Sequence, residues 1–314
     1  MHHPRSFVLA IAAVALGTVA SPAGVTLEKN EEAQTVAINI RGEHFTTYHY
    51  GDSQHVPFLW PVKAEGGVGV TRNFPMGSDE PSVEDHPHHI SLYLTYGVLN
   101  GFDFWHVGRG RPGVIRTVGI HTGEGDGYGW IRGRHHWIAN EDDEIVMEEK
   151  RELRFHDTPA NARVFDFIST FKATQGDVTF GDTKEGMLGV RMSPMLDGNH
   201  GGTLTNAEGH QGEDNVYGKP SPWMDYTGEA EGHGKRGIAI LDHPENPKPA
   251  QWHVRDYGLA ALNPFGTRSV AGLEDGRHTL PEGETLTFRY RLVVHSGCHE
   301  TADIAGHHAR YIAE

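Results

Sequence analysis

The chain has 314 residues, of which 37% are hydrophobic and 22% charged, and its 42 acidic against 27 basic residues give a formal net charge of −15. A surplus of negative charge repels nucleic-acid phosphates and anionic lipids, so we expect a neutral or cationic small molecule as ligand and no nucleic-acid partner. The single cysteine, Cys298, excludes an intramolecular disulfide, so the core must stabilise the fold.

The first 20 residues predict a secretory signal peptide. Arg5 precedes an apolar run over residues 7–19, and small residues end the segment at Ala20. The run is short for a membrane span and is followed at once by Ser-Pro-Ala-Gly. We therefore expect export to the periplasm or the extracellular space, without membrane insertion.

Short period-two patterns dominate the remainder of the chain. They are clearest over residues 35–40, 45–50, 58–62, 90–96, 145–155, 164–171, 187–192, 237–241 and 286–295. In the two longest of these segments, 145–155 and 286–295, apolar side chains alternate with polar ones, which predicts strands with one solvated face. Antiparallel sheets tolerate such a face, and amphipathic helices do not regularly follow the strands. We predict an all-β fold, with residues 21–314 forming a single large antiparallel β-sandwich.

Two further features complete the expected architecture. The 40 glycines concentrate in apparent connections, over residues 66–67, 108–113, 123–129, 198–202 and 228–237, which predicts long, shaped loops. Only residues 301–312 have apolar side chains at helical spacing, so we expect a short C-terminal helix.

A histidine-rich segment is the first candidate for chemistry. It reads Asp85-His86-Pro87-His88-His89 and precedes a strand pattern. Proline restricts the residue before it, so we expect an extended backbone in which His86 and His88 share one side. Imidazoles exchange protons near neutral pH and also bind metals. Proton transfer by His88 or His89 is therefore one hypothesis, and a divalent-metal site on His86 and His88 is a weaker alternative.

A Lys184-Glu185 pair lies in a glycine-bounded turn before a strand that ends near Arg191. Most such pairs are solvated surface pairs of little energetic consequence. Here the flanking glycines permit close approach of a ligand, so the three side chains are candidates for acid, base and hydroxyl contact.

Aromatic residues beside polar ones mark further candidates. They are Glu208 with Trp223 and Tyr226, the pair Trp252 and Arg255, and then Asn263. Sugar rings bind on aromatic faces while polar side chains take the hydroxyls, although core aromatics with polar neighbours give the same pattern. The string Asp242-His243-Pro244 echoes Asp85-His86-Pro87, so the two segments are predicted to meet at one rim.

Taken in order, these strings resemble the DUF6807 family. The resemblance rests on the histidine segment and on residues 100–105, 181–186, 237–244, 256–258 and 263–265. It implies a sandwich similar to the galactose mutarotase-like superfamily, in proteins of bacteria that degrade glycans. In or beside these strings, the resemblance points to His88, His89, Lys184, Glu185, His243, Arg255 and Asn263 as the family's characteristic residues. This chain departs from many relatives at Ile90, where they have a basic residue after the paired histidines.

The family is often labelled methane oxygenase PmoA. A methane monooxygenase subunit lies in the membrane through several apolar helices, and this sequence has no such segment after residue 20. We therefore expect the protein not to be a methane monooxygenase.

The combined expectation is a carbohydrate-active enzyme that acts on a glycoside or an oxidised keto sugar by general acid/base catalysis, without a required cofactor. Its catalytic candidates are His88, His89, Lys184, Glu185 and His243. Its substrate contacts are Asp85, His86, Asp103, Trp105, Arg191, Glu208, Trp223, Tyr226, Trp252, Arg255 and Asn263. A non-catalytic carbohydrate-binding protein and a histidine-ligated metalloenzyme are the alternatives.

Overall fold

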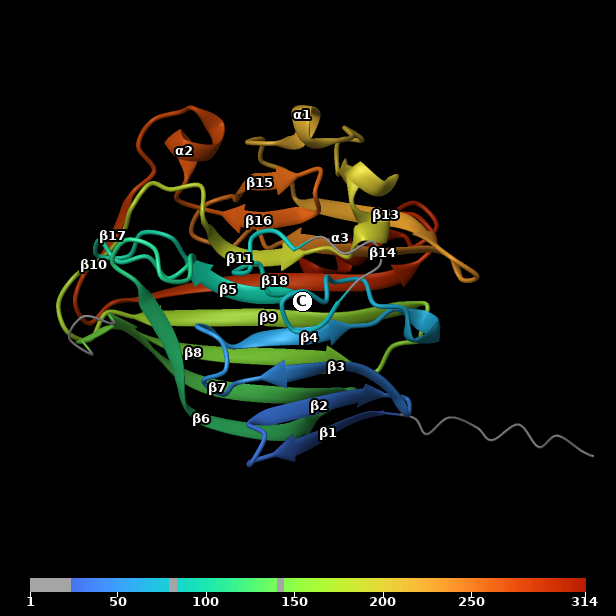
Figure 1. Ribbon diagram of the computed structural model, residues 1–314, viewed down its shortest axis with the longest axis horizontal. Helices are drawn as coiled ribbons and strands as arrows, with labels where there is room; N and C mark the ends of the chain where they lie inside the picture. Colours follow the sequence, from blue (N-terminus) through green and yellow to red (C-terminus); the bar gives the residue numbers. More distant parts are fainter. Residues whose placement is uncertain (1–23, 79–83, 140–143) are drawn as a thin grey trace, which may run out of the picture.

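The computed structural model describes residues 24–78, 84–139 and 144–314 (Figure 1). The expected signal peptide lies outside these residues. Two eight-stranded sheets account for most of the fold, and every strand pairing within them is antiparallel. The prediction of a large antiparallel β-sandwich is confirmed.

The first sheet has the order β1-β2-β3-β4-β5-β11-β16-β15. Its strands are β1 (Val25–Asn30), β2 (Thr35–Ile40), β3 (Glu43–His49), β4 (Phe58–Val62), β5 (Leu92–Tyr96), β11 (Gly186–Arg191), β15 (Gln251–Arg255) and β16 (Leu259–Asn263). The neighbours β5 and β11 are about ninety residues apart in sequence, so distant loops meet at this part of the sheet.

The second sheet has the order β12-β13-β14-β18-β9-β8-β7-β6. Its strands are β6 (Gly113–Gly125), β7 (Tyr128–Ala139), β8 (Glu144–His156), β9 (Ala162–Lys172), β12 (Thr203–Asn206), β13 (Trp223–Ala230), β14 (Gly234–Asp242) and β18 (Thr285–Ser296). A two-stranded sheet pairs β10 (Val178–Phe180) with β17 (His278–Leu280). The helices are α1 (Glu213–Val216), α2 (Thr267–Ala271) and α3 (Ile304–Tyr311), with 3₁₀ turns at Glu65–Gly67, Pro194–Leu196 and Gly198–His200.

The two sheets pack through their apolar faces. Phe45 of the first sheet contacts Phe155 and Phe165 of the second at ring-centroid distances of 6.3 and 5.6 Å, both edge-to-face. Tyr48, which follows an irregularity in the strand register, also points at the second sheet, whereas His49 lies on the opposite side. We call that opposite side the outer face of the first sheet.

The glycine-rich residues 123–129 are mostly strand, contrary to expectation, and only residues 126–127 form the connection. Gly123, Gly125 and Gly129 lie within the β6–β7 hairpin. A Cβ on Gly123 would lie 2.2 Å from Cζ2 of Trp130, and one on Gly125 would lie 2.3 Å from Cζ of Tyr128. These glycines are strand residues because aromatic rings of the paired strand lie across their backbone.

The C-terminal helix is present as α3, but α1 and α2 were not predicted. Ile304 and Tyr311 of α3 pack against Val293 of β18 in a second apolar cluster. The expected solvated face of β18 is therefore wrong for its second half, where Arg291 and His295 are buried.

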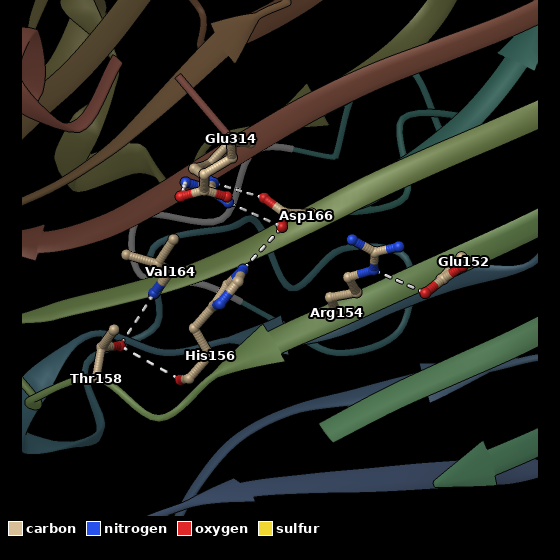
Figure 2. A network of polar contacts seen from close by, with 8 residues as sticks. Glu152, Arg154, His156, Thr158, Val164, Asp166 and Glu314 are labelled. Atoms are coloured by element: carbon tan, nitrogen blue, oxygen red, sulfur yellow. Dashed lines mark hydrogen bonds and ion pairs between the residues drawn. The ribbon is translucent and has the colours of Figure 1, made fainter. Parts of the chain in front are cut away.

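Beside α3, Figure 2 shows a polar row on the outside of the second sheet. Asp166 accepts from Arg291 at 2.6 Å and lies 2.7 Å from Nε2 of His156. Arg291 also donates to Glu314, so these contacts hold the residues after α3 against β18.

A second polar network lies between the sheets, where an apolar core was expected. Nε of Arg151 donates to Glu149 at 2.8 Å, and their side chains are 1% and 0% exposed. A second nitrogen of Arg151 lies 3.4 Å from the hydroxyl of Tyr48, which lies 3.3 Å from Nε2 of His135. Buried charges require such pairing, so the network ties β3 to β7 and β8.

The substitution Arg151→Met is expected to lower the free energy of unfolding by about 3–5 kcal/mol, because it leaves Glu149 buried without a countercharge. The double variant Arg151→Met/Glu149→Gln removes both charges and should recover much of that loss in urea unfolding. Arg154→Met on the same strand breaks the more exposed pair with Glu152 (Figure 2) and should cost about 1 kcal/mol or less. Equal losses in the two single variants would contradict the prediction.

A pH dependence follows from His135, because burial lowers its pKa from 6.5 to about 3. Between these values the unfolded chain binds a proton that the folded chain does not, so stability is complete above the unfolded pKa and falls as the pH is lowered. The substitution His135→Asn removes this pH-dependent contribution of His135 to the free energy of unfolding. The difference in unfolding free energy between parent and variant should shrink by about 2 kcal/mol from about pH 7.5 to about pH 5. If urea unfolding gives the same difference in free energy between parent and variant at every pH, the prediction is refuted.

Candidate active site

The histidine segment forms a turn, not the extended backbone that was predicted. The amide of His89 donates to the carbonyl of His86 at 2.9 Å, and His86 has φ of 41°. The rings of His86 and His89 are stacked at 4.8 Å, so these two histidines share a side. The ring of His88 lies edge-on to His89 at 4.4 Å. Pro87 fits the second position of such a turn, where its fixed φ is favourable.

Asp85 attaches this turn to the first sheet. Its carboxylate accepts from Arg72 at 2.5 Å and from Arg191 at 2.8 Å. Burial would raise the pKa of Asp85, but Arg191, a hydrogen bond to His86 and Arg72 together hold it below the ordinary value. Arg72 also donates to the carbonyls of His86 and His89. Asp85 therefore positions the turn, and its oxygens are engaged within the protein.

A further histidine, His106, was not singled out from the sequence. Its Nδ1 lies 2.8 Å from Oδ2 of Asp103, whose other oxygen accepts the amide of His106. This pairing places the proton on Nδ1 and leaves a lone pair on Nε2. The ring of His88 lies 4.6 Å from that of His106. The Asp-x-x-His spacing, typical of a carboxylate that caps a turn, was the available signal.

Glu185 lies next to His106. Its Oε1 is 3.9 Å from Nε2 of His106 and 3.8 Å from Nζ of Lys184. Its Oε2 is buried without a hydrogen-bond partner among the described residues. Burial raises the pKa of Glu185, and Lys184 and His106 partly offset this rise. A carboxyl in this environment keeps its proton to higher pH than an exposed carboxyl does, which favours a role as proton donor.

The turn that carries Lys184 and Glu185 is held by two buried side chains. Asn263 donates to the carbonyl of Thr183 at 2.6 Å, and Nδ1 of His253 lies 2.8 Å from the carbonyl oxygen of Lys184. Asn263 and His253 therefore support this turn through its backbone carbonyls.

The His106–Asp103 pair and the Lys184–Glu185 turn line one open cavity of about 510 Å³. Its charged and imidazole side chains are Asp103, His106, Arg109, Asp182, Lys184 and Glu185. Nη1 of Arg109 lies 3.4 Å from Nε2 of His106. The histidine turn and the Lys-Glu turn thus meet, through His106, at one place.

Of three other candidates, Arg191 and Trp105 contact the histidine turn, and Arg255 lies farther along the same sheet. Arg191 and Arg255 occupy one register row of the outer face, each paired with Leu259. Arg255 forms a 2.8 Å ion pair with Glu213 of α1. Trp105 is buried, with its ring 5.8 Å from that of His89, and supports the histidine turn from behind.

The remaining candidates are not brought to the cavity. His243 contacts Tyr311 of α3 and lines a separate, proline-rich cavity, so the predicted meeting of the two Asp-His-Pro strings is wrong. Glu208 is exposed on the turn between β12 and β13. Trp223, Tyr226 and Trp252 are buried, and the last two bond backbone carbonyls. The aromatic pattern there reflects core packing.

The weaker metal hypothesis gains no support from the geometry. Within residues 24–78, 84–139 and 144–314, no group of three or more His, Cys, Asp or Glu side chains converges as metal ligands do. The rings of His86 and His88 lie 5.8 Å apart at 76° to each other.

In the part of the chain described here, no helix has the length and apolar character needed to cross a membrane.

Comparisons with known proteins show which family the chain belongs to. No curated protein matches it. A solved structure titled "Putative kojibiose phosphorylase from human microbiome" is similar with a TM-score of 0.34 and 7% identity, over 65% of this chain and 25% of that one. The chain thus spans about a quarter of that structure's length. A family model described as "Family of unknown function (DUF6807)" matches residues 35–309, and the chain therefore belongs to the DUF6807 family.

Proposed function

We propose that the protein is an exported carbohydrate-active enzyme that acts by general acid/base catalysis on a glycoside or a keto sugar. One observation carries the proposal. A buried carboxyl with a raised pKa, Glu185, faces Nε2 of His106, whose ring Asp103 orients through Nδ1. An acid and an oriented base on one cavity wall perform paired proton transfers.

The geometry favours a keto sugar over a simple glycoside. Glycoside hydrolysis commonly uses two carboxyl groups about 5–9.5 Å apart. Here the partner of Glu185 is an imidazole at 3.9 Å, which suits proton transfers at neighbouring atoms on one side of a ring. Such transfers are what elimination or epimerisation beside a carbonyl requires.

The proposed elimination balances without a further reactant. In a 3-keto glycoside, Nε2 of His106 takes the proton from C2 and the C–H electrons form an enolate. The enolate collapses to a C1–C2 double bond as the C1–O bond breaks, and protonated Glu185 gives its proton to the departing oxygen. Lys184 and Arg109 carry positive charge toward the transient enolate oxygen.

A non-catalytic sugar-binding protein is less well supported. Such modules bind sugar rings on accessible aromatic faces. The predicted platforms Trp105, Trp223 and Trp252 are 1%, 6% and 0% exposed.

Glu185→Gln and His106→Asn are each expected to reduce turnover of a 3-keto methyl glucoside by about 10²–10⁴-fold, because each removes one proton transfer. His243→Asn, outside the cavity, is the matched control and should retain parental rates. Product formation is followed by liquid chromatography, with circular dichroism to verify folding. Parental rates in both folded cavity variants would refute the proposal.

The pH–rate profile should identify the acid. Activity falls as the pH rises through the raised pKa of Glu185, because the carboxyl must hold a proton to donate it. Lys184 lowers that pKa by favouring the carboxylate, so Lys184→Met should move the alkaline limb of kcat/KM to higher pH. A limb that stays in place or moves to lower pH would assign the acid to another group.

A further inference from the structure

A register row with two positive charges crosses the outside of the second sheet. His135 of β7 and Arg151 of β8 point between the sheets, so their chain neighbours Arg134 and Lys150 point outward, where both are exposed. Arg134 pairs directly with Lys150, which pairs in turn with Thr170 of β9. Like charges directly opposite each other in an antiparallel pair are destabilising. This row is therefore an electrostatic conflict on the surface of the sheet.

The two flanking rows on the same strands have balanced charges. On one side, the carboxylate of Glu152 accepts from Arg132 at 3.3 Å and from Arg154 at 2.7 Å. On the other side, Glu148 pairs in register with Lys172 of β9. The row between them therefore lacks the negative charge that each flanking row contains.

The unbalanced row lines an open cavity of about 350 Å³, together with Ile168 and Thr170. Arg134 leans toward β6, since a Cβ on Gly119 of that strand would lie 4.0 Å from its Nη2. In the part of the chain that the structure describes, the side chains of Arg134 and Lys150 form no ion pair with the protein. The two cations thus border a space in the size range of ligand pockets, roughly 300–1,000 Å³, and their charges are available to a ligand.

The chemistry of this cavity suits a sugar that carries a carboxylate. A carboxylate accepts hydrogen bonds from a guanidinium and an ammonium group together. The side chain of Ile168 and the methylene stems of the two cations offer an apolar surface to the C–H face of a sugar ring. Glu148 and Glu152 lie on either side of Lys150 along β8, so a densely charged phosphate or sulfate polymer would meet repulsion there. A chain with one carboxylate on each ring avoids most of that repulsion.

We propose that the cavity between Arg134 and Lys150 is a surface site for uronic-acid polysaccharides, which holds a carboxylated glycan against the outside of the second sheet. The formal net charge of −15 opposes a polyanion at long range. Screening limits that opposition to about 8 Å at physiological ionic strength, so the local pair of cations decides the contact. This cavity shares no lining residue with the acid/base cavity, and the site does not depend on the proposed reaction.

The test is biolayer interferometry with immobilised polygalacturonate, with neutral dextran and dextran sulfate as comparison surfaces. Arg134→Gln/Lys150→Gln should weaken binding to polygalacturonate by about tenfold or more, because two charge-assisted contacts are lost. Lys219→Gln/Lys235→Gln is the matched control, since it removes the same charge from exposed lysines outside the cavity and should bind as the parent does. Circular dichroism verifies that both variants fold.

The outcomes separate this site from net charge and from the acid/base proposal. Binding of the parent that weakens as sodium chloride is added, and that only the cavity variant loses, would support the site. Equal losses in the cavity and control variants, unchanged binding in the cavity variant, or no binding of polygalacturonate by the parent would overturn it. Equal binding to neutral dextran, or tighter binding to dextran sulfate than to polygalacturonate, would also overturn it. Glu185→Gln should bind polygalacturonate as the parent does, so failure of either proposal leaves the other standing.

Discussion

The site depends on one carboxylate that two buried guanidinium groups share. Asp85 accepts from both Arg72 and Arg191, and Arg72 also binds backbone carbonyls of the histidine turn. Because Arg191 belongs to β11, this clamp fixes the turn against the strand that begins beside Glu185. The distance between the histidines and the acid is therefore set by the rigid length of a short strand, not by flexible loops.

Burial divides the titratable groups of the site into two kinds. Burial and neighbouring positive charge keep His88 and His89 neutral, with the pKa of His88 lowered to about 3, so neither is suited to accept a proton near neutral pH. The same burial favours the protonated form of Glu185. His106 is oriented by a carboxylate, so under the proposed function the role of base falls to a histidine that stands apart from the conspicuous triple-histidine string.

The sequence supports the fold prediction better than the site prediction, for physical reasons. Strand periodicity is local, so segments such as β4 were located from residues 58–62 alone. The hairpin glycines were misassigned because their requirement, an aromatic ring across the backbone, lies on the paired strand. His243 was misplaced because sequence echoes carry no information on which sheet a strand joins. The approach of the histidine turn to Glu185, through His106, needs the β5–β11 pairing, which no local pattern encodes.

The position of Glu185 is held from β15 through the backbone of Lys184. His253 holds the carbonyl of Lys184, and Glu185 is the next residue, so any shift of the imidazole moves the acid. Substitution of His253 is therefore expected to disturb the position of Glu185 relative to His106.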